Sequence, residues 1–328
     1  MYLLGIDGGG TKTEGVVADA YGNVFVRVVT GPSNPTSMSK EEFERTISEL
    51  LQQIQSKNPD IFNQIEVCFA GMAGVGEKGS QRYAKELLKK YLPSRINIFV
   101  DNDAVNALYS GTLGDAGIVQ IAGTGAITFG INKNKKVSRV GGWGYLFDDE
   151  GSGFYLGNEA LKAVFKEHDG RGPSTTLKKQ ILSYFQLESV PEIIEKVYGR
   201  EHSKSVIAPI SRFVVEEAIN QDVVALKIIG EACEKMFHSI KTCHQVLFQN
   251  EEPTIIVLSG GVFTDSKLFI QRFQKLAMSS TLPNLMFRKN IIPPVGGAIV
   301  AGLNNVQMKL GVEFAETFYK QFKEFDIL

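Results

Sequence analysis

Two stretches of this chain share the same order of predicted elements, and this internal repeat constrains the fold more than any other feature of the sequence. Apolar runs lie at residues 2–6, 13–19 and 24–29 in the first stretch, and at 117–121, 127–131 and 137–140 in the second. Turns rich in Gly, Thr or Asn separate the runs, which predicts strand, turn, strand, turn, strand in both places. The sequence therefore predicts one structural unit used twice.

The period of the apolar residues changes after each set of three strands. In the first half it predicts, in order, a helix over 39–55, a strand over 65–70, a helix over 81–91, a strand over 96–100 and a helix from 103. In the second half it predicts helices over 152–166, 174–185 and 223–248, a strand over 255–258, a helix over 265–278, a strand over 285–288 and a helix from 296. The predicted fold class is α/β, with a duplicated βββαβαβα order and insertions in the second half.

The glycine-rich segment directly after the first predicted strand, residues 7–13, is a candidate phosphate-binding loop. Glycines let successive backbone N–H groups approach an anion closely, and a carboxylate beside a phosphate calls for a bridging Mg²⁺ ion, which makes Asp7 a candidate metal ligand. A Walker loop and a dinucleotide fingerprint are both excluded, because a strand rather than a helix is predicted after the glycines. A glycine-rich hairpin turn with a surface aspartate is the alternative. Two further strands that end in small residues, at 122–126 and 259–262, favour nucleotide chemistry.

Composition limits the classes of function that this chain can serve. Its 328 residues suffice for two domains of ordinary size. A formal net charge of −1 and the lack of a Lys/Arg cluster argue against a nucleic-acid or anionic-membrane partner. No apolar run approaches the roughly 20 residues that cross a bilayer, and no basic leader precedes the first apolar residues, so we expect a cytoplasmic protein. Cys68, Cys233 and Cys243 lie far apart, which predicts core positions rather than a disulfide or metal site.

Four motifs together resemble the BadF/BadG/BcrA/BcrD-type ATPase family, within the superfamily of actin-like ATPases and sugar kinases. They are residues 7–13, residues 101–104, residues 122–125, and residues 141–144 followed by 148–152. The last pair is the most specific, and it is similar to that of the N-acetylglucosamine kinase-like amino-sugar kinases. The resemblance covers nearly the whole chain. It implies an actin-like, ribonuclease H-like sugar kinase fold of two lobes, with the nucleotide in a cleft between them.

The resemblance also implies a division of the chain into lobes. The N-terminal lobe would span residues 1–117 and hold the first phosphate loop and the catalytic aspartate. The C-terminal lobe would span 118–328 and hold the second phosphate loop and the adenosine site. Gly111, Gly114 and Gly117 interrupt the pattern at the expected hinge. An aromatic-rich helix at about 312–325 is expected to pack back on the N-terminal lobe.

The activity that the resemblance implies is ATP-dependent phosphorylation of an N-acetylated amino sugar at its 6-hydroxyl. The acceptor is N-acetylglucosamine, N-acetylmuramic acid or both, the cofactors are ATP and Mg²⁺, and the usual assembly is a homodimer. The residues assigned to the nucleotide are Gly8, Gly9, Gly10, Thr11, Gly123 and Thr124 at the phosphates, Gly260 and Gly261 at the adenosine, and Asp7 at the metal ion.

Two aspartates near the end of the strand at 96–100 are candidates for the general base. Asp101 and Asp103 flank Asn102 at the start of a predicted helix, and only one of the two is expected to serve as the base. The resemblance selects Asp103, since the catalytic aspartate of the family precedes Ala at the matching position. A helix N-cap is the alternative role for Asp103, and a turn or capping role is expected for Asp101.

The sugar would bind to Asn34, Asp103, Gly142, Trp143, Gly144 and Asp149, again by likeness to N-acetylglucosamine kinases. Planar amide and carboxylate groups suit sugar hydroxyls, and an aromatic face suits the apolar side of a pyranose ring. The family has Gly where this chain has Asp148, so either Asp148 or Asp149 is open as the sugar contact. Trp143 could instead anchor the core.

Three other functions stay open at this point. A glucosamine kinase would use the same residues on a different amino sugar. An activator of a reductase would need an iron–sulfur cluster, which these cysteines do not offer. A non-catalytic sugar sensor would not require the carboxylates of Asp7 and Asp103.

Overall fold

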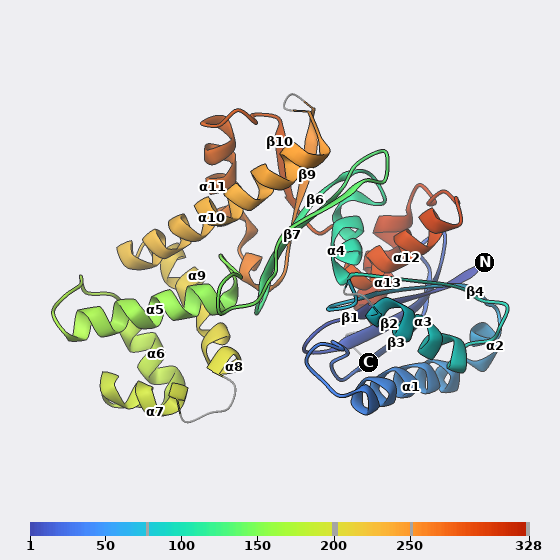
Figure 1. Ribbon diagram of the computed structural model, residues 1–328, viewed down its shortest axis with the longest axis horizontal. Coiled ribbons are helices and arrows are strands. Elements are labelled where there is room, and N and C mark those ends of the chain that lie inside the picture. The colour runs from blue at the N-terminus through green and yellow to red at the C-terminus, as the bar shows by residue number, and fades with distance from the viewer. Residues whose placement is uncertain (77–78, 199–202, 250–251, 326–328) are drawn as a thin grey trace. The chain divides into compact units, whose positions relative to one another are not determined.

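A computed structural model describes residues 1–76, 79–198, 203–249 and 252–325, which fold into two compact units (Figure 1). The first unit comprises Met1–Asp115 and the residues from Asn290 onward, and the second comprises Ala116–Lys289. The sequence analysis assigned all residues after 117 to the second lobe and expected only the last helix to return. The contacts of the structure instead group everything from Asn290 onward, two helices included, with the first unit.

The first unit is built on a five-stranded sheet with the strand order β3-β2-β1-β4-β5. The strands are β1 (Tyr2–Gly8), β2 (Thr13–Asp19), β3 (Val24–Thr30), β4 (Ile65–Met72) and β5 (Asn97–Asp101). β1 pairs antiparallel with β2 and parallel with β4, so it is the central strand, and its residues from Leu3 to Ile6 are buried. The carboxyl ends of β1, β4 and β5 consequently meet at one edge of the sheet.

Helices cover both faces of this sheet (Figure 1). They are α1 (Lys40–Lys57), α2 (Pro59–Phe62), α3 (Ser80–Tyr91), α4 (Asp103–Thr112), α12 (Pro294–Asn305) and α13 (Phe314–Glu324). Helix α1 begins at the N-cap Ser39, whose side chain forms a capping box with Glu42. Its apolar side, predicted from the sequence, is buried against the sheet in one cluster with residues of α3. α12 packs on β1 and α4 from the other side.

The terminal helix α13 packs on the first unit, against β3. Phe314, Phe318 and Phe322 are buried at a spacing of four residues and stack on one another. The Gln321 side chain accepts a hydrogen bond from the backbone N–H of Val24 at 2.7 Å. The aromatic side of this helix and its side-chain amide together fix it to the strand.

The second unit repeats the arrangement with the sheet order β10-β9-β6-β7-β8. Its strands are β6 (Gly117–Ala122), β7 (Ala126–Ile131), β8 (Val137–Gly141), β9 (Thr254–Ser259) and β10 (Leu285–Lys289). β6 pairs antiparallel with β7 and parallel with β9, as β1 pairs with β2 and β4 in the first unit. The duplicated α/β fold predicted from the sequence is confirmed.

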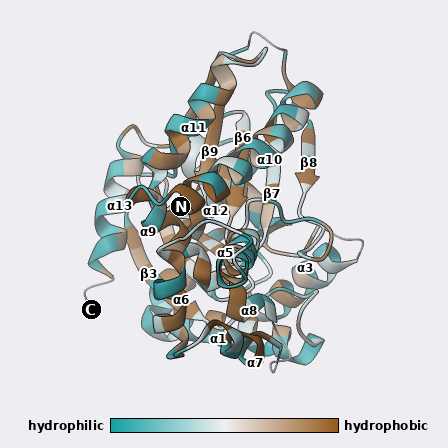
Figure 2. Ribbon diagram, turned by 90° about the vertical axis from the view of Figure 1, so that its left-hand side faces the viewer, coloured by the Kyte–Doolittle hydropathy of each residue, from teal (hydrophilic) through white to brown (hydrophobic). Residues whose placement is uncertain are grey.

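The helices of the second unit are more numerous than the sequence analysis predicted. They are α5 (Gly153–His168), α6 (Leu177–Phe185), α7 (Ile193–Tyr198), α8 (Ser203–Ile207), α9 (Ser211–Ile219), α10 (Val223–Leu247) and α11 (Ser266–Met278). Helices α10 and α11 carry both hydrophobic and hydrophilic residues along their length (Figure 2), as expected for helices that bury one side. Helices α7, α8 and α9 were missed because each has fewer than three turns and shows little of the helical period. None of the helices in the described parts of the chain is long and apolar enough to cross a membrane.

All three cysteines are free and buried, as the sequence analysis predicted. Burial raises the pKa of each thiol to about 12. These cysteines are therefore neutral packing residues, and within the described residues no group of three or more His, Cys, Asp or Glu side chains could hold a metal ion.

Contact between α4 and α12 depends on Gly297. A Cβ atom at this position would lie 1.9 Å from the backbone oxygen of Asn106. We predict that Gly297→Ala lowers the free energy of unfolding by about 1–3 kcal/mol or more, because the two helices must separate. Urea unfolding measures this change. The control is Gly302→Ala on the same helix, where the nearest atom would be a flexible Leu3 methyl at 3.2 Å; an equal loss in both variants would contradict the prediction.

Candidate functional site

The first glycine loop joins β1 to β2 and is anchored at its beginning by backbone hydrogen bonds. The carbonyl of Gly8 accepts from the N–H of Ala73 at 2.8 Å, and the carbonyl of Gly9 accepts from the N–H of Ser33 at 3.0 Å. A Cβ atom on Gly8 would lie 2.5 Å from Ser33 Oγ, so glycine is required there. The loop is thus held against the segments that follow β3 and β4.

The second part of the same loop is open. A Cβ atom on Gly10 would meet no atom within 4 Å, and both Gly10 and Thr11 are exposed. A loop that is fixed at Gly8 and Gly9 and open at the next two residues presents backbone and hydroxyl groups to a ligand without rearranging. This arrangement suits a phosphate group.

Asp7 is the last residue before the glycines, and its half-buried carboxylate has one well-defined partner. The side-chain amide of Asn106 donates to Asp7 Oδ1 at 2.8 Å. Burial nevertheless raises the pKa of Asp7 to about 6, an effect that the Asn106 hydrogen bond opposes and the charge of Glu14 reinforces. The carboxylate is therefore under-compensated in the protein alone.

A divalent cation fits the donor groups at this place. Asp7 and Asp103 are two neighbouring carboxylates, and the charge of Asp7 contributes to the raised pKa of Asp103. Mg²⁺ prefers carboxylate oxygens and substrate phosphates, and it is usually held by one or two protein carboxylates. The residues present match that preference.

Asp103 begins helix α4 beside Asp7. The N-cap of the helix is Asn102, whose Oδ1 accepts from the N–H of Ala104 at 2.9 Å, so the carboxylate of Asp103 is not the capping group. Burial, together with the charge of Asp7, raises the pKa of Asp103 to about 7. A carboxylate with a pKa near neutrality is well suited to accept a proton.

Asp101 occupies a different environment. Its side chain is exposed, and Oδ1 accepts from the N–H of Asn102 at 2.7 Å. Partial desolvation of the carboxylate raises its pKa, and the charge of Asp7 is not among the causes. This local hydrogen bond matches the turn role expected for Asp101.

Asn34 is half-buried in the loop after β3, next to the segment that follows β4. Its Oδ1 accepts from both the N–H and the hydroxyl of Thr36, at 3.0 and 2.7 Å. It also contacts Gly74, where a Cβ atom would lie 2.3 Å from Oδ1. The amide oxygen therefore stabilises the loop that contains Asn34.

The second glycine loop, between β6 and β7, forms the matching turn of the second unit. The N–H of Gly123 donates to the carbonyl of Gly125 at 2.9 Å, and the carbonyl of Gly123 accepts from the N–H of Gly153 at 2.7 Å. Thr124 at the tip is exposed. The start of helix α5 thus fixes this loop while its tip stays open.

Asp149 lies buried beneath the second glycine loop. Its Oδ1 accepts from the N–H of Ala126 at 3.3 Å, and its Oδ2 pairs with Lys204 Nζ at 3.2 Å. A Cβ atom on Gly125 would lie 2.8 Å from Asp149 Oδ2. Asp149 also adopts a left-handed backbone conformation, with φ of 61°. A non-glycine residue in this conformation at a candidate site is held there by its surroundings.

The glycine pair after β9 lies against the end of β6. Gly260 has a φ of 108°, and a Cβ atom there would lie 2.4 Å from the carbonyl oxygen of Ala122. Gly261 begins a short 3-10 helix and is exposed. The structure therefore brings together three candidate segments of the second unit: the loop at 123–125, Asp149, and the glycine pair.

Trp143 is not part of the core. Its side chain is 66% exposed, in a loop where Gly142 and Gly144 both have positive φ values. The Arg139 guanidinium lies 4.3 Å from the centre of the indole ring. This stacking keeps the ring at the surface, and the alternative that Trp143 anchors the core is excluded.

Asp148 and Asp149 have different partners. Asp148 Oδ2 accepts from the backbone N–H of Trp143 at 2.9 Å and so closes the loop. Asp149 faces the second glycine loop instead. Asp148, which stands where the family has Gly, therefore stabilises the loop that contains it.

Two polar residues of these clusters were missed by the sequence analysis. Asn106 lies three residues after Asp103 on α4, and that spacing places both on one side of the helix, so the sequence did contain a signal. Lys204 lies on the short helix α8, which the sequence analysis did not predict. No pattern in the sequence around Lys204 linked it to Asp149.

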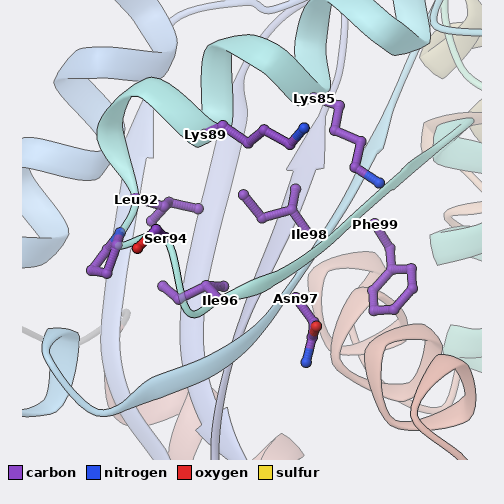
Figure 3. Close-up of a pocket in the computed structure, with 9 residues that line it drawn as sticks. Lys85, Lys89, Leu92, Ser94, Ile96, Asn97, Ile98 and Phe99 are labelled. Atoms are coloured by element: carbon purple, nitrogen blue, oxygen red, sulfur yellow. The ribbon is translucent and has the colours of Figure 1, made fainter.

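A separate hollow of about 410 Å³ lies between α3 and β5 (Figure 3). Lys85 and Lys89 extend from the helix, and Ile96 and Ile98 form part of its apolar lining. None of the candidate residues lines it. It adjoins the amino-terminal half of β5, whereas Asp103 follows the carboxyl end of that strand.

Comparison with known proteins gives consistent matches over most of the chain. A model of the BadF/BadG/BcrA/BcrD ATPase family matches residues 4–303. The N-acetylmuramic acid/N-acetylglucosamine kinase of Clostridium acetobutylicum is 34% identical over 274 residues, which cover 84% of this chain and 89% of that protein. The N-acetyl-D-glucosamine kinase of Dictyostelium discoideum is 30% identical over 314 residues, covering 92% and 98%.

One solved structure shows the same fold. It is a Porphyromonas gingivalis protein with the provisional name N-acetylglucosamine kinase, similar with a TM-score of 0.72 and 20% sequence identity. The match covers 94% of this chain and all of that one.

The raised pKa of Asp103 predicts a pH-dependent stability in metal-free buffer. Between its unfolded pKa near 4 and its folded pKa of about 7, the folded state binds the extra proton, so stability is lost as the pH rises through this window. Asp103→Asn removes this loss. Relative to the unsubstituted protein, we expect the variant to gain about 2–3 kcal/mol in unfolding free energy between about pH 5 and pH 8.

Urea unfolding with a chelator at both pH values measures this gain. The exposed Asp60, substituted as Asp60→Asn, is the control. A pH-independent difference between Asp103→Asn and the unsubstituted protein would contradict the assignment.

Proposed function

This chain belongs to the BadF/BadG/BcrA/BcrD ATPase family, and from that premise we propose that it transfers the γ-phosphoryl group of ATP to the 6-hydroxyl of an N-acetylated amino sugar. The acceptor is N-acetylglucosamine, N-acetylmuramic acid or both. The relatives from C. acetobutylicum and D. discoideum, which bear the names of such kinases, support this choice of acceptor.

The observation that carries the proposal is the pairing of Asp103 with Asp7 beside the first glycine loop. One acid has a pKa near neutrality and the other is an under-compensated carboxylate next to an open, anchored loop. A base and a cation holder at one end of a sheet are what phosphoryl transfer to a hydroxyl requires.

In the proposed reaction Asp103 accepts the proton of the sugar hydroxyl. The hydroxyl oxygen then forms a bond to the γ-phosphorus as the bond between that phosphorus and the β–γ bridging oxygen breaks, which releases ADP. A pKa of about 7 lets Asp103 be ionised before the step and protonated after it.

The phosphate groups are assigned to backbone and hydroxyl donors. In the first unit these are the amide of Gly10 and the hydroxyl of Thr11; Gly8 and Gly9 allow close approach, and the N–H of Gly9 already donates to the carbonyl of Lys12. In the second unit the donor is Thr124, and Gly123 allows close approach while its N–H donates to the carbonyl of Gly125. Asp7 would hold Mg²⁺, which neutralises charge on the phosphate oxygens when bound. Gly260 and Gly261 would allow the adenosine to approach the backbone.

The sugar is assigned to two polar side chains and one aromatic ring. Asn34 and Asp149 would bind hydroxyl or amide groups of the sugar, and the exposed ring of Trp143 would face its apolar side. Because Asp149 pairs with Lys204 in the free protein, sugar binding at Asp149 would exchange or extend that ion pair.

No observation favours the activity of a reductase activator. The three thiols are buried, with pKa values raised to about 12. Cluster ligation needs thiolates, so these residues do not suit an iron–sulfur centre.

A coupled ADP-release assay with ATP, Mg²⁺ and a panel of hexoses tests the proposed function. We expect N-acetylglucosamine or N-acetylmuramic acid to stimulate ADP release far more than glucose does, and the phosphate to appear at the 6-position by NMR. Glucosamine is included because it differs from the proposed acceptors by lacking the acetyl group. Sugar-independent ADP release, or none at all, would overturn the proposal.

Asp103→Asn tests the assigned base. We expect kcat to fall by about 10² or more with a modest change in sugar KM, since the amide cannot accept the proton. Asp101→Asn is the matched control two residues away, and its kcat should change little. Equal kcat values for Asp103→Asn and the unsubstituted protein would place the base elsewhere.

A further inference from the structure

Asn106 is a fully buried polar residue of α4 that has no assigned role in the reaction. Its side-chain nitrogen faces three acceptors. They are Asp7 Oδ1 at 2.8 Å, the carbonyl of Ile6 at 3.1 Å and the carbonyl of Gly71 at 3.3 Å. The shortest of these contacts joins residues 99 positions apart and ends on the candidate metal ligand.

The orientation of this amide is fixed by its surroundings. A Cβ atom on Gly71 would lie 2.3–2.4 Å from the Asn106 amide group, so the β4 backbone closes on one side of it. A Cβ atom on Gly297 of α12 would lie 1.9 Å from the backbone oxygen of Asn106. Because its three neighbours are all acceptors, only the nitrogen can point at them.

The oxygen of the Asn106 amide carries an energetic cost. Asn106 Oδ1 is buried and has no hydrogen-bond partner among the described residues. An unpartnered buried acceptor destabilises a protein, and an apolar side chain of similar size would avoid that cost. Asn106 thus lowers the stability of the protein at the point where its nitrogen donates a hydrogen bond to Asp7.

We propose that Asn106 is the positioning residue of the cation site. It occupies Asp7 Oδ1 and thereby fixes the carboxylate so that Oδ2 is presented to a divalent cation on the nucleotide. This inference rests on the proposed assignment of Asp7, and it extends that assignment to a residue which itself touches neither nucleotide nor sugar. The alternative is a purely structural clip between the ends of β1 and β4.

Asn106→Leu distinguishes the two roles, because it keeps the size of the side chain and removes its donors. Ser110→Ala is the matched control: Ser110 is a buried polar residue one turn further along α4, and its hydroxyl donates to the carbonyl of Ala107 rather than to Asp7. Mn²⁺ binding to the full-length protein with ADP is followed by electron paramagnetic resonance. Unfolding in a chelator reports any structural effect separately.

We expect Asn106→Leu to weaken Mn²⁺ binding in the ADP complex by about tenfold and to raise the Mg²⁺ concentration for half-maximal activity similarly. The KM for the sugar should stay within about threefold, and Ser110→Ala should leave Mn²⁺ binding unchanged. A folded Asn106→Leu protein with unaltered Mn²⁺ affinity would overturn the proposal and leave only the structural clip.

Two further measurements keep the proposal testable. If Asn106→Leu does not fold, Asn106→Ser replaces it, since the smaller polar side chain fits the same space. In an Asp7→Asn background, substitution of Asn106 should cause no additional loss of Mn²⁺ affinity, and an additive loss would overturn the proposal. Asn106-dependent Mn²⁺ binding without sugar phosphorylation would uphold this inference while refuting the proposed acceptor.

Discussion

Close contact between backbones at the carboxyl end of the first sheet is the constraint on which the candidate site depends. Helix α4 can approach β4 and α12 only because Gly71 and Gly297 have no side chains. That approach seats Asn106 between the strand ends and brings Asp103 to Asp7.

The electrostatic state of the pair follows from that packing. Burial raises the pKa of both acids, the charge of Asp7 adds to the effect on Asp103, and the Asn106 hydrogen bond offsets only part of the effect on Asp7. Such a pair favours either a shared proton or a bound cation. The stored cost is of the kind expected where chemistry, rather than stability, has selected the residues.

The second unit holds its glycine loop with other residues than the first unit does. Its glycine loop is fixed from below by Asp149, which takes the N–H of Ala126 and the ammonium group of Lys204. Here the buried carboxylate forms an ion pair with Lys204, whereas the hydrogen bond to the Asp7 carboxylate comes from the neutral amide of Asn106. The two units therefore share the glycine turn after the first strand but differ in the charged residues around it.

The amino-acid sequence by itself determined the duplicated order of strands and helices, the three glycine turns and the burial of the cysteines. These features rest on local periodicity and turn chemistry, which are properties of neighbouring residues. It could not determine the helices from 190 to 219, whose short segments carry little period, nor the grouping of α12 with the first unit.

Only the tertiary structure decided which polar groups meet. Asn106 and Asp7 are 99 residues apart and Lys204 and Asp149 are 55 apart, so no local pattern joins them. It also placed Trp143 at the surface and gave Asp148 a partner within its own loop. Burial and hydrogen bonding depend on the whole fold, and they set the pKa of a carboxylate and the orientation of an amide, which residue type alone leaves open.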